Sequence, residues 1–141
     1  MRILALDYGS KTVGGAVTDE LGLTALAIGT LRRLKENHLR STLRGIDDWI
    51  KTYNVDTIVV GHPLNMDGTV GERAKKSEDF ANDLHDRTGL PVFLWDERLT
   101  SIEAEEILRD AGKSREDIKE EVDTVAAVLI LEDYMQNAKE G

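Results

Sequence analysis

The segment RILALDYGSK, residues 2–11, decides how this chain is expected to fold. Its apolar run RILAL, residues 2–6, predicts a buried β-strand that ends at Asp7. Glycines then indicate a turn into a second strand: Gly9, Gly14 and Gly15. A carboxylate is therefore expected at the carboxyl end of the first strand.

The rest of the chain alternates between strand and helix patterns. The second and third strands, residues 15–19 and near 24–30, are joined by the hairpin signal DELG. Apolar residues at helical spacing and short apolar runs then predict, in order, a helix over 39–53, a strand over 56–60, a helix over 74–84, a buried strand over 92–95 and helices over 100–111 and 122–135.

This order, β-β-β-α-β-α-β-α-α, predicts an α/β fold. The first three strands suggest an antiparallel meander, and the later strands, separated by helices, suggest parallel right-handed crossovers. The expected architecture is a five-stranded mixed sheet flanked by helices, in the ribonuclease H-like arrangement. In such a sheet, ligands collect at the carboxyl ends of the strands. At 141 residues the chain is expected to form a single domain, 1–141.

Composition restricts the possible classes of protein. The chain has no cysteine, which excludes a disulfide or a zinc site built on cysteine, and its 40% apolar and 32% charged residues are ordinary for a globular domain. The N-terminus shows no charged leader and no long apolar stretch, so neither a signal peptide nor a membrane span is expected.

The net charge of −9 weighs against nucleic acid as a partner, but the charge is unevenly distributed. Residues 1–75 carry ten basic and nine acidic side chains, whereas residues 76–141 carry eight and eighteen. A basic stretch lies in the neutral half: Arg32, Arg33, Lys35, Arg40 and Arg44, with Glu36 as its one acid. It could contact a nucleic-acid backbone or simply be a solvated helix face.

Acidic residues are expected to converge at one edge of the sheet. Asp7 ends the first strand and Asp96 and Glu97 end the fifth, while Asp123 lies in the first turn of the 122–135 helix, facing the protein. Singly, such acids could cap turns, form surface pairs or favour a helix dipole. Together they would repel one another unless neutralised, and an all-oxygen ligand set favours Mg²⁺ or Mn²⁺.

Other residues near this edge have more than one interpretation. The backbone amides after Asp7 and the Lys11 ammonium could hold a phosphate, although Lys11 could equally be a solvent-exposed side chain. His62, beside Pro63, could shuttle protons but is more often a bystander in such a position. The segment from Asn65 to Arg73 suits a mobile lid or a substrate-contacting loop.

Four ordered motifs resemble the YqgF/RuvX family, which is described as Holliday junction resolvase-like or pre-ribosomal-RNA nucleases. The resemblance runs nearly end to end, through residues 7–11 with Gly14, 61–68, 96–101 and 122–127. It implies a ribonuclease H-like, cytoplasmic bacterial nuclease that matures the 5′ end of pre-16S ribosomal RNA, with Asp7, Glu97 and Asp123 as the catalytic and metal-binding acids. Nothing catalytic carries over to His62.

Metal-dependent phosphodiester hydrolysis follows from this resemblance. One or two divalent ions on the three acids would activate water and stabilise the leaving 3′ oxygen. Lys11, Arg98, Asn65 and Arg73 are the expected substrate-binding residues, and Asp96 is a possible additional ligand. Precursor ribosomal RNA is the expected nucleic-acid partner, with a ribosomal subunit as a further possible one.

Three alternatives remain open at this stage. A DNA junction resolvase would share the chemistry but would need a dimer, and the sequence specifies neither monomer nor homodimer. A non-catalytic RNA-binding assembly factor would have little use for the three acids. A sugar-kinase-like or actin-like ATPase also begins with Asp-x-Gly, but such enzymes close two lobes around ATP, and this length suits one.

Overall fold

The computed structural model describes residues 2–98 and 100–140, with the side chains of 138–140 set aside. The elements in chain order are β1 (Ile3–Tyr8), β2 (Thr12–Thr18), β3 (Ala25–Arg32), α1 (Arg40–Tyr53), β4 (Thr57–His62), α2 (Glu72–Thr88), β5 (Val92–Asp96), α3 (Thr100–Asp110) and α4 (Arg115–Glu140). This is the predicted order of strands and helices.

The strands form one mixed sheet in the order β3-β2-β1-β4-β5. β1, β2 and β3 pair antiparallel, and β1, β4 and β5 run parallel, which confirms both the meander and the crossovers. The turn between β2 and β3 is held by Asp19, whose Oδ1 accepts a hydrogen bond of 2.7 Å from the amide of Leu23, while Gly22 adopts a φ of 70°. That geometry suits the predicted hairpin turn.

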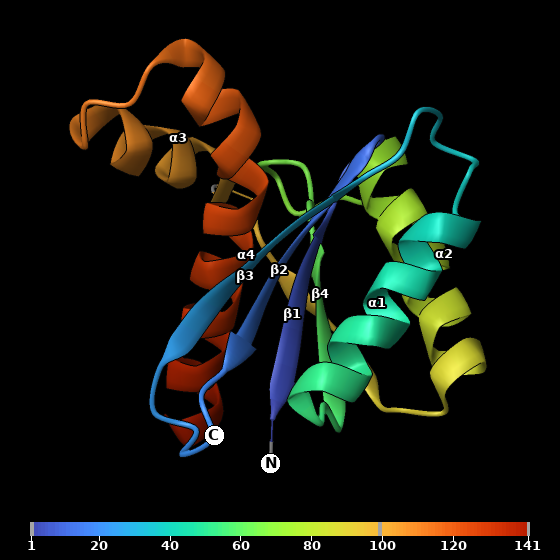
Figure 1. The fold of residues 1–141 in the computed structure, drawn as a ribbon. Coiled ribbons are helices and arrows are strands. Elements are labelled where there is room, and N and C mark those ends of the chain that lie inside the picture. Colours follow the sequence, from blue (N-terminus) through green and yellow to red (C-terminus); the bar gives the residue numbers. More distant parts are fainter. Residues whose placement is uncertain (1, 99, 141) are drawn as a thin grey trace.

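Helices cover both faces of the sheet (Figure 1). α1 and α2 lie on one face, where Leu4, Leu6, Ile58 and Val60 meet Ile46, Phe80 and Leu84. α4 lies on the other face, where Ala5, Ala16 and Val59 meet Ala127, Ile130 and Leu131, and α3 packs against α4. Alternate residues of each strand thus enter different cores, since side chains along a strand point to opposite faces.

Two expectations about the strands are wrong in detail. β5 is not buried: Phe93 and Leu94 are 48% and 37% exposed, because β5 is an edge strand. The second strand also begins earlier than predicted, at Thr12, so Gly14 lies inside β2 and not in a turn.

The last helix begins earlier than apolarity alone predicted. α4 starts at Arg115, so Asp123 lies in its third turn and not in its first. The acidic segment is helical because its Glu, Lys and Arg residues are good helix formers, and the Ser114 hydroxyl accepts a hydrogen bond of 3.1 Å from the amide of Asp117 at the helix start.

The basic stretch does not form one solvated face. Arg33 is buried, Arg32 donates a hydrogen bond to the Glu120 carbonyl, and Arg40 and Arg44 are exposed on α1. Among the described helices, none combines the length and the apolarity that crossing a membrane would need.

Candidate active site

The carboxyl ends of β1, β4 and β5 meet at one edge of the sheet, the upper edge in Figure 1. Asp7 is the last but one residue of β1, and Glu97 directly follows β5. Asp7 alternates with Leu6 and Tyr8, which enter the core under α1 and α2, so Asp7 projects to the α4 face. Glu97 follows Trp95, a residue of the α4 core, by two positions, which places both acids on the same face.

Gly61 of β4 allows Glu97 to reach toward Asp7 across the intervening strand. A Cβ atom at position 61 would lie 2.5 Å from Glu97 Oε1 and 2.7 Å from Ile130 Cδ1. The amide of Glu97 also donates a hydrogen bond of 3.2 Å to the His62 carbonyl, which anchors its backbone to β4. The sequence pattern predicts that this strand ends at residue 60, whereas Gly61 lies inside β4.

Asp123 reaches the site because α4 lies directly on β2. A Cβ atom at Gly14 would overlap the Asp123 carbonyl, so a glycine at this position lets the two backbones touch. The Thr12 hydroxyl donates a hydrogen bond of 2.5 Å to Asp123 Oδ2, and the hydroxyls of Thr30 and Thr124 pair beside it. These contacts hold the third carboxylate over the end of β1.

The carboxyl groups of Asp7 and Glu97 are strongly perturbed. Both are buried, with 8% and 7% exposure. Burial, reinforced by the charge of Asp123, raises the pKa of Asp7 from 3.8 to about 7. Burial, reinforced by the charge of Asp7, raises the pKa of Glu97 from 4.5 to about 9. Hydrogen bonds among the three carboxyl groups contribute to both shifts, so the acids form one interacting set.

This acid set fits a divalent cation by its chemistry. The donors are oxygens only, and buried like charges are relieved by a cation between them. Among residues 2–98 and 100–140, however, no three acidic or imidazole groups are already spaced as a metal cluster. The raised pKa values of Asp7 and Glu97 favour their protonated forms, and Thr12 holds Asp123, so a bound ion would take the place of the protons on Asp7 and Glu97.

Two of the predicted substrate-binding residues lie beside β5 and already have partners. Arg98 forms an ion pair of 2.8 Å with Asp96 and donates a hydrogen bond of 3.1 Å to the Met66 carbonyl. The hydrogen bonds from Arg98 lower the pKa of Asp96. Asn65 donates a hydrogen bond of 2.9 Å to the Thr69 hydroxyl.

The other two predicted substrate-binding residues lie near Asp7. Lys11 is exposed in the turn after β1. Arg73 is on the first turn of α2 and not in a loop, because that helix begins at Glu72; the predicted loop therefore ends before Arg73. The Arg73 charge lowers the pKa values of both Asp7 and Glu97, which places it within electrostatic reach of the acid set.

The imidazole of His62 is separated from the acid set. His62 and Val60 are two residues apart in β4, so both side chains point to the face of the sheet that α1 and α2 cover. On that face, His62 Nε2 lies 2.8 Å from Glu78 Oε2. The contact with Glu78 on α2 accounts for the position of this imidazole, whereas the acid set meets His62 through the backbone carbonyl.

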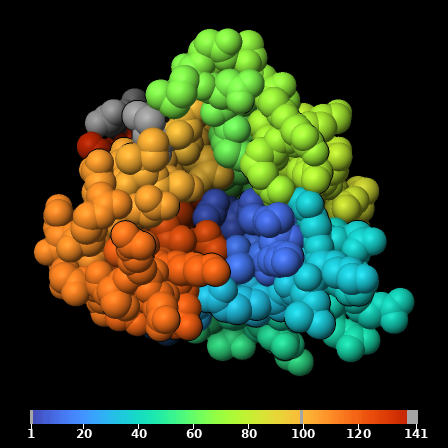
Figure 2. Space-filling model, turned by 90° about the horizontal axis from the view of Figure 1, so that it is seen from above, coloured from blue at the N-terminus to red at the C-terminus, as the bar shows by residue number. Residues whose placement is uncertain are grey.

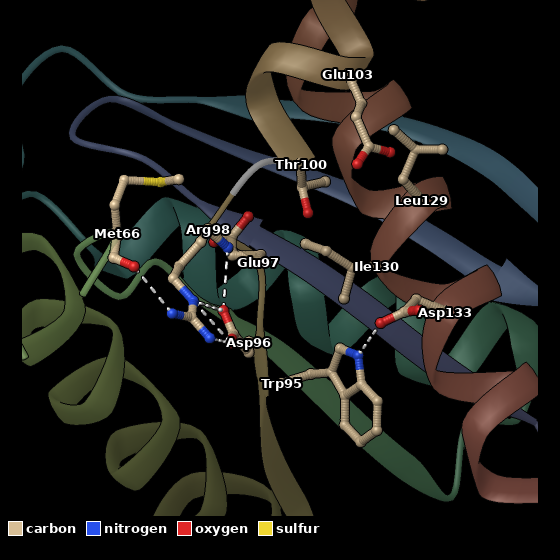
Figure 3. A pocket seen from close by; sticks show the side chains of 10 residues that line it. All are labelled: Met66, Trp95, Asp96, Glu97, Arg98, Thr100, Glu103, Leu129, Ile130 and Asp133. Carbon is tan, nitrogen blue, oxygen red and sulfur yellow. Dashed lines mark hydrogen bonds and ion pairs between the residues drawn. The ribbon is translucent and has the colours of Figure 1, made fainter. Parts of the chain in front are cut away.

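A cavity of about 430 Å³ opens beside Glu97, between the end of β5, α3 and α4 (Figure 3). Trp95 forms part of its wall and donates a hydrogen bond of 2.5 Å from its indole nitrogen to Asp133 on α4. Glu103 reaches in from α3, and Arg98 lies between the Met66 carbonyl and Asp96. The sequence did not predict this cavity, because its walls come from separate elements.

Figure 2 looks down on the edge of the sheet that carries the acids. The N-terminal residues, in blue, lie between α3 and α4 in orange and red, the segment after β4 in green and the segment after β3 in cyan. The N-terminal residues are thus bordered on this side of the molecule by segments that are far apart in the sequence.

Comparison with known proteins identifies the family. A family model described as "RuvX: Holliday junction resolvase" matches residues 1–137. A protein of Lachnospira eligens is 53% identical over 137 residues, covering 97% of this chain and 98% of its own length, and one of Bacillus subtilis is 45% identical over 137 residues, covering 97% and 99%. Each carries the name "Putative pre-16S rRNA nuclease".

Solved structures share the fold at low identity. RuvC of Thermus thermophilus superposes with a TM-score of 0.56 at 12% identity, covering 98% of this chain and 97% of that one. The fowlpox virus Holliday junction resolvase gives 0.58 at 14% identity, covering 98% and 99%. Together with the sheet order, these matches establish the predicted ribonuclease H-like fold, and the match over residues 1–137 with close relatives of equal length establishes that the chain belongs to the RuvX family.

Proposed function

We propose that this chain is a metal-dependent nuclease that hydrolyses RNA phosphodiester bonds and acts in maturing the 5′ end of pre-16S ribosomal RNA. The observation that carries the proposal is the set of Asp7, Glu97 and Asp123 at the carboxyl edge of the sheet, in which Asp7 and Glu97 are buried and have pKa values raised by burial and by repulsion within the set. Strongly perturbed carboxyl groups of this kind are typical of catalytic and metal-binding sites.

Asp7, Glu97 and Asp123 would hold Mg²⁺ or Mn²⁺, which, when bound, would lower the pKa of the attacking water and stabilise charge on the leaving 3′ oxygen. Asp7 and Glu97 would release their protons on binding, since ionised carboxylates are the effective ligands. Gly61 keeps the path of Glu97 open, and Thr12 orients Asp123.

Cationic and polar residues around the acid set would bind the substrate. Arg73 and Lys11 lie on the side of the turn after β1, and Arg98 and Asn65 lie beside β5. Arg98 would bind a phosphate by exchanging its ion pair with Asp96, and the exposed Lys11 is free to approach the backbone. Phosphate contacts of this kind would make binding salt-dependent in spite of the net charge of −9.

RNA is favoured as the substrate by the relatives. Proteins 45–53% identical over nearly the whole chain carry a name that refers to pre-16S rRNA. The test is cleavage of a pre-16S RNA fragment by wild type, Asp7→Asn and the matched surface control Asp86→Asn, with Mg²⁺, with Mn²⁺ and with EDTA. We expect cleavage by wild type and Asp86→Asn with either ion, and none by Asp7→Asn or with EDTA. Equal cleavage by wild type and Asp7→Asn would falsify the catalytic assignment.

Resolution of four-way DNA junctions is the second candidate function. It is favoured by the description of the matching family model and by a fold shared with two resolvases. A four-way DNA junction in the same assay separates the two candidates: cutting of the junction with intact RNA would replace the RNA proposal. Binding of RNA without any cleavage, in the presence of either metal, would instead favour a non-catalytic assembly factor.

A further inference from the structure

A group of cations lies on the opposite side of β1 from the acid set. The phenol ring of Tyr8, which follows Asp7, stacks on Phe80 of α2 with a centroid distance of 4.1 Å and an interplanar angle of 11°. The guanidinium groups of Arg33 and Arg73 lie 4.9 and 5.1 Å from the centroid of the same ring. Two positive charges are therefore gathered beside the backbone that carries Asp7.

Glu36 binds two cations of this group at once. Its Oε1 lies 2.8 Å from Arg73 Nη1, and its Oε2 lies 3.0 Å from Lys76 Nζ. The backbone carbonyl of Glu36 also accepts a hydrogen bond of 3.1 Å from Arg33 Nε. The Glu36 carboxylate thus bridges Arg73 and Lys76, and Lys76 also lies 3.6 Å from Oε1 of Glu72, one turn earlier on α2.

Two buried donors in this group lack a partner. Arg33 is 7% exposed, and its Nη1 has no acceptor among residues 2–98 and 100–140; the same is true of Arg73 Nε. Leaving buried donors unpaired is costly, and it is most costly for charged groups. The described contacts therefore leave one donor of each guanidinium group without an acceptor.

The position of the cations relates them to the acid set. Arg73 Nη2 donates a weak hydrogen bond of 3.5 Å to the Tyr8 carbonyl, and Arg33 Nη2 donates one of 2.7 Å to the Gly9 carbonyl. Both arginines hence contact the turn that follows Asp7. An anion held by Arg73 and Lys76 would be adjacent to a phosphodiester placed at the acids.

Glu36 is held by contacts that a ligand can replace. It lies in the segment 33–39 between β3 and α1, outside the helices and strands. The side chains of Glu36, Arg73 and Lys76 are 33%, 36% and 40% exposed, so solvent and ligand reach the ion pairs. Partly exposed ion pairs contribute little to stability, and another anion exchanges with them readily.

We infer that Arg73 and Lys76, backed by Arg33, form a second phosphate-binding site for the RNA strand, and that the Glu36 carboxylate occupies this site until a backbone phosphate displaces it. The two non-bridging oxygens of a phosphodiester match the two oxygens with which Glu36 bridges Arg73 and Lys76. The inference rests on the proposed nuclease function and extends it: Glu36 competes with the substrate, and the strand passes over the turn after β1.

The test measures binding of a fluorescently labelled single-stranded RNA oligonucleotide in EDTA by anisotropy, over a series of salt concentrations. Each partly exposed ion pair is worth roughly a factor of two to five, so Glu36→Gln should tighten binding roughly five- to twentyfold. Lys76→Gln should weaken binding and make the slope of log K against log salt shallower by about 0.7. In a Lys76→Gln background, Glu36→Gln should have a smaller effect than it has alone.

Glu20→Gln is the matched control, since it removes one negative charge from an exposed residue of the turn between β2 and β3. If Glu36→Gln and Glu20→Gln change the affinity equally, or if Glu36→Gln weakens binding while its thermal unfolding matches wild type, the inference is wrong. These outcomes are independent of cleavage. If the protein binds RNA with the expected order of affinities but never cuts it, the phosphate site stands and the nuclease proposal fails.

Discussion

Replacing Asp7 by Asn should stabilise the metal-free protein at neutral and alkaline pH. The pKa of Asp7 is 3.8 when unfolded and about 7 when folded, so the folded state binds a proton more tightly. Below pH 3.8 the carboxyl is protonated in both states and this proton stabilises the fold fully. As pH rises through about 7, the folded protein loses the proton and, with it, this stabilisation. Glu97 acts in the same direction up to about pH 9.

The size of the effect follows from the shift in pKa. One pKa unit corresponds to ~1.4 kcal/mol, so the rise from 3.8 to about 7 corresponds to roughly 4 kcal/mol. Asparagine has a similar shape and no charge, so Asp7→Asn should be more stable than wild type by up to this amount at about pH 8. For a domain of this length, that is a rise in Tm of roughly 10 °C. At about pH 4 the two proteins should be nearly equal.

Urea unfolding in EDTA, followed by the fluorescence of Trp49 and Trp95, measures this difference as a function of pH. Wild type should lose stability from about pH 4 to about pH 9, whereas Asp7→Asn should show a flatter profile. Added Mg²⁺ should stabilise wild type more than Asp7→Asn, because ligands stabilise the state that binds them. The control Asp86→Asn should follow wild type. An Asp7→Asn protein that is less stable than wild type at about pH 8, or that has the same pH profile, would refute the picture of mutually repelling buried acids.

Substitutions at neighbouring positions test the rest of the site. Gly61→Ala should abolish cleavage and cost roughly 1–3 kcal/mol by urea unfolding, since its Cβ would lie 2.5 Å from Glu97 Oε1; retention of full activity would contradict the path assigned to Glu97. Gly14→Ala should be more destabilising than Gly61→Ala, because its Cβ would overlap the backbone carbonyl of Asp123, which cannot rotate away as a side chain can; the same unfolding assay would contradict this if the order were reversed. His62→Gln should cleave RNA with the same pH dependence as wild type. If the acidic or the basic arm of the pH–rate profile disappears in this variant, His62 has a role in proton transfer.

Local patterns predicted most of the fold. The apolar run before Asp7, the glycine-bearing hairpin signal and the helical spacing over residues 39–53 each correspond to an element of the structure, and the order of these elements implied the mixed sheet. Such patterns act through near neighbours in the chain, and they are therefore readable without tertiary contacts. The apolar pattern alone places the start of α4 too late, because helix-forming residues and the Ser114 cap extend this helix back to Arg115.

Features that depend on long-range packing were not predictable in this way. β5 is exposed because it lies at the edge of the sheet. Arg73 is helical because α2 begins at Glu72, beside the segment after β3. In the sequence, Glu36 is the one acid of a basic stretch. The fold brings its side chain into contact with Arg73 and Lys76, which are about forty residues further along the chain.

The sequence by itself determined the order of strands and helices, the family resemblance and the identity of the acids at one edge of the sheet. The tertiary structure decided how those acids meet. Glu97 reaches Asp7 because β4 has no side chain at Gly61, and Asp123 reaches them because α4 touches β2 at Gly14. Both contacts join segments far apart in the chain, and their geometry depends on which face of the sheet each residue takes, a property that exists only once the strands are paired.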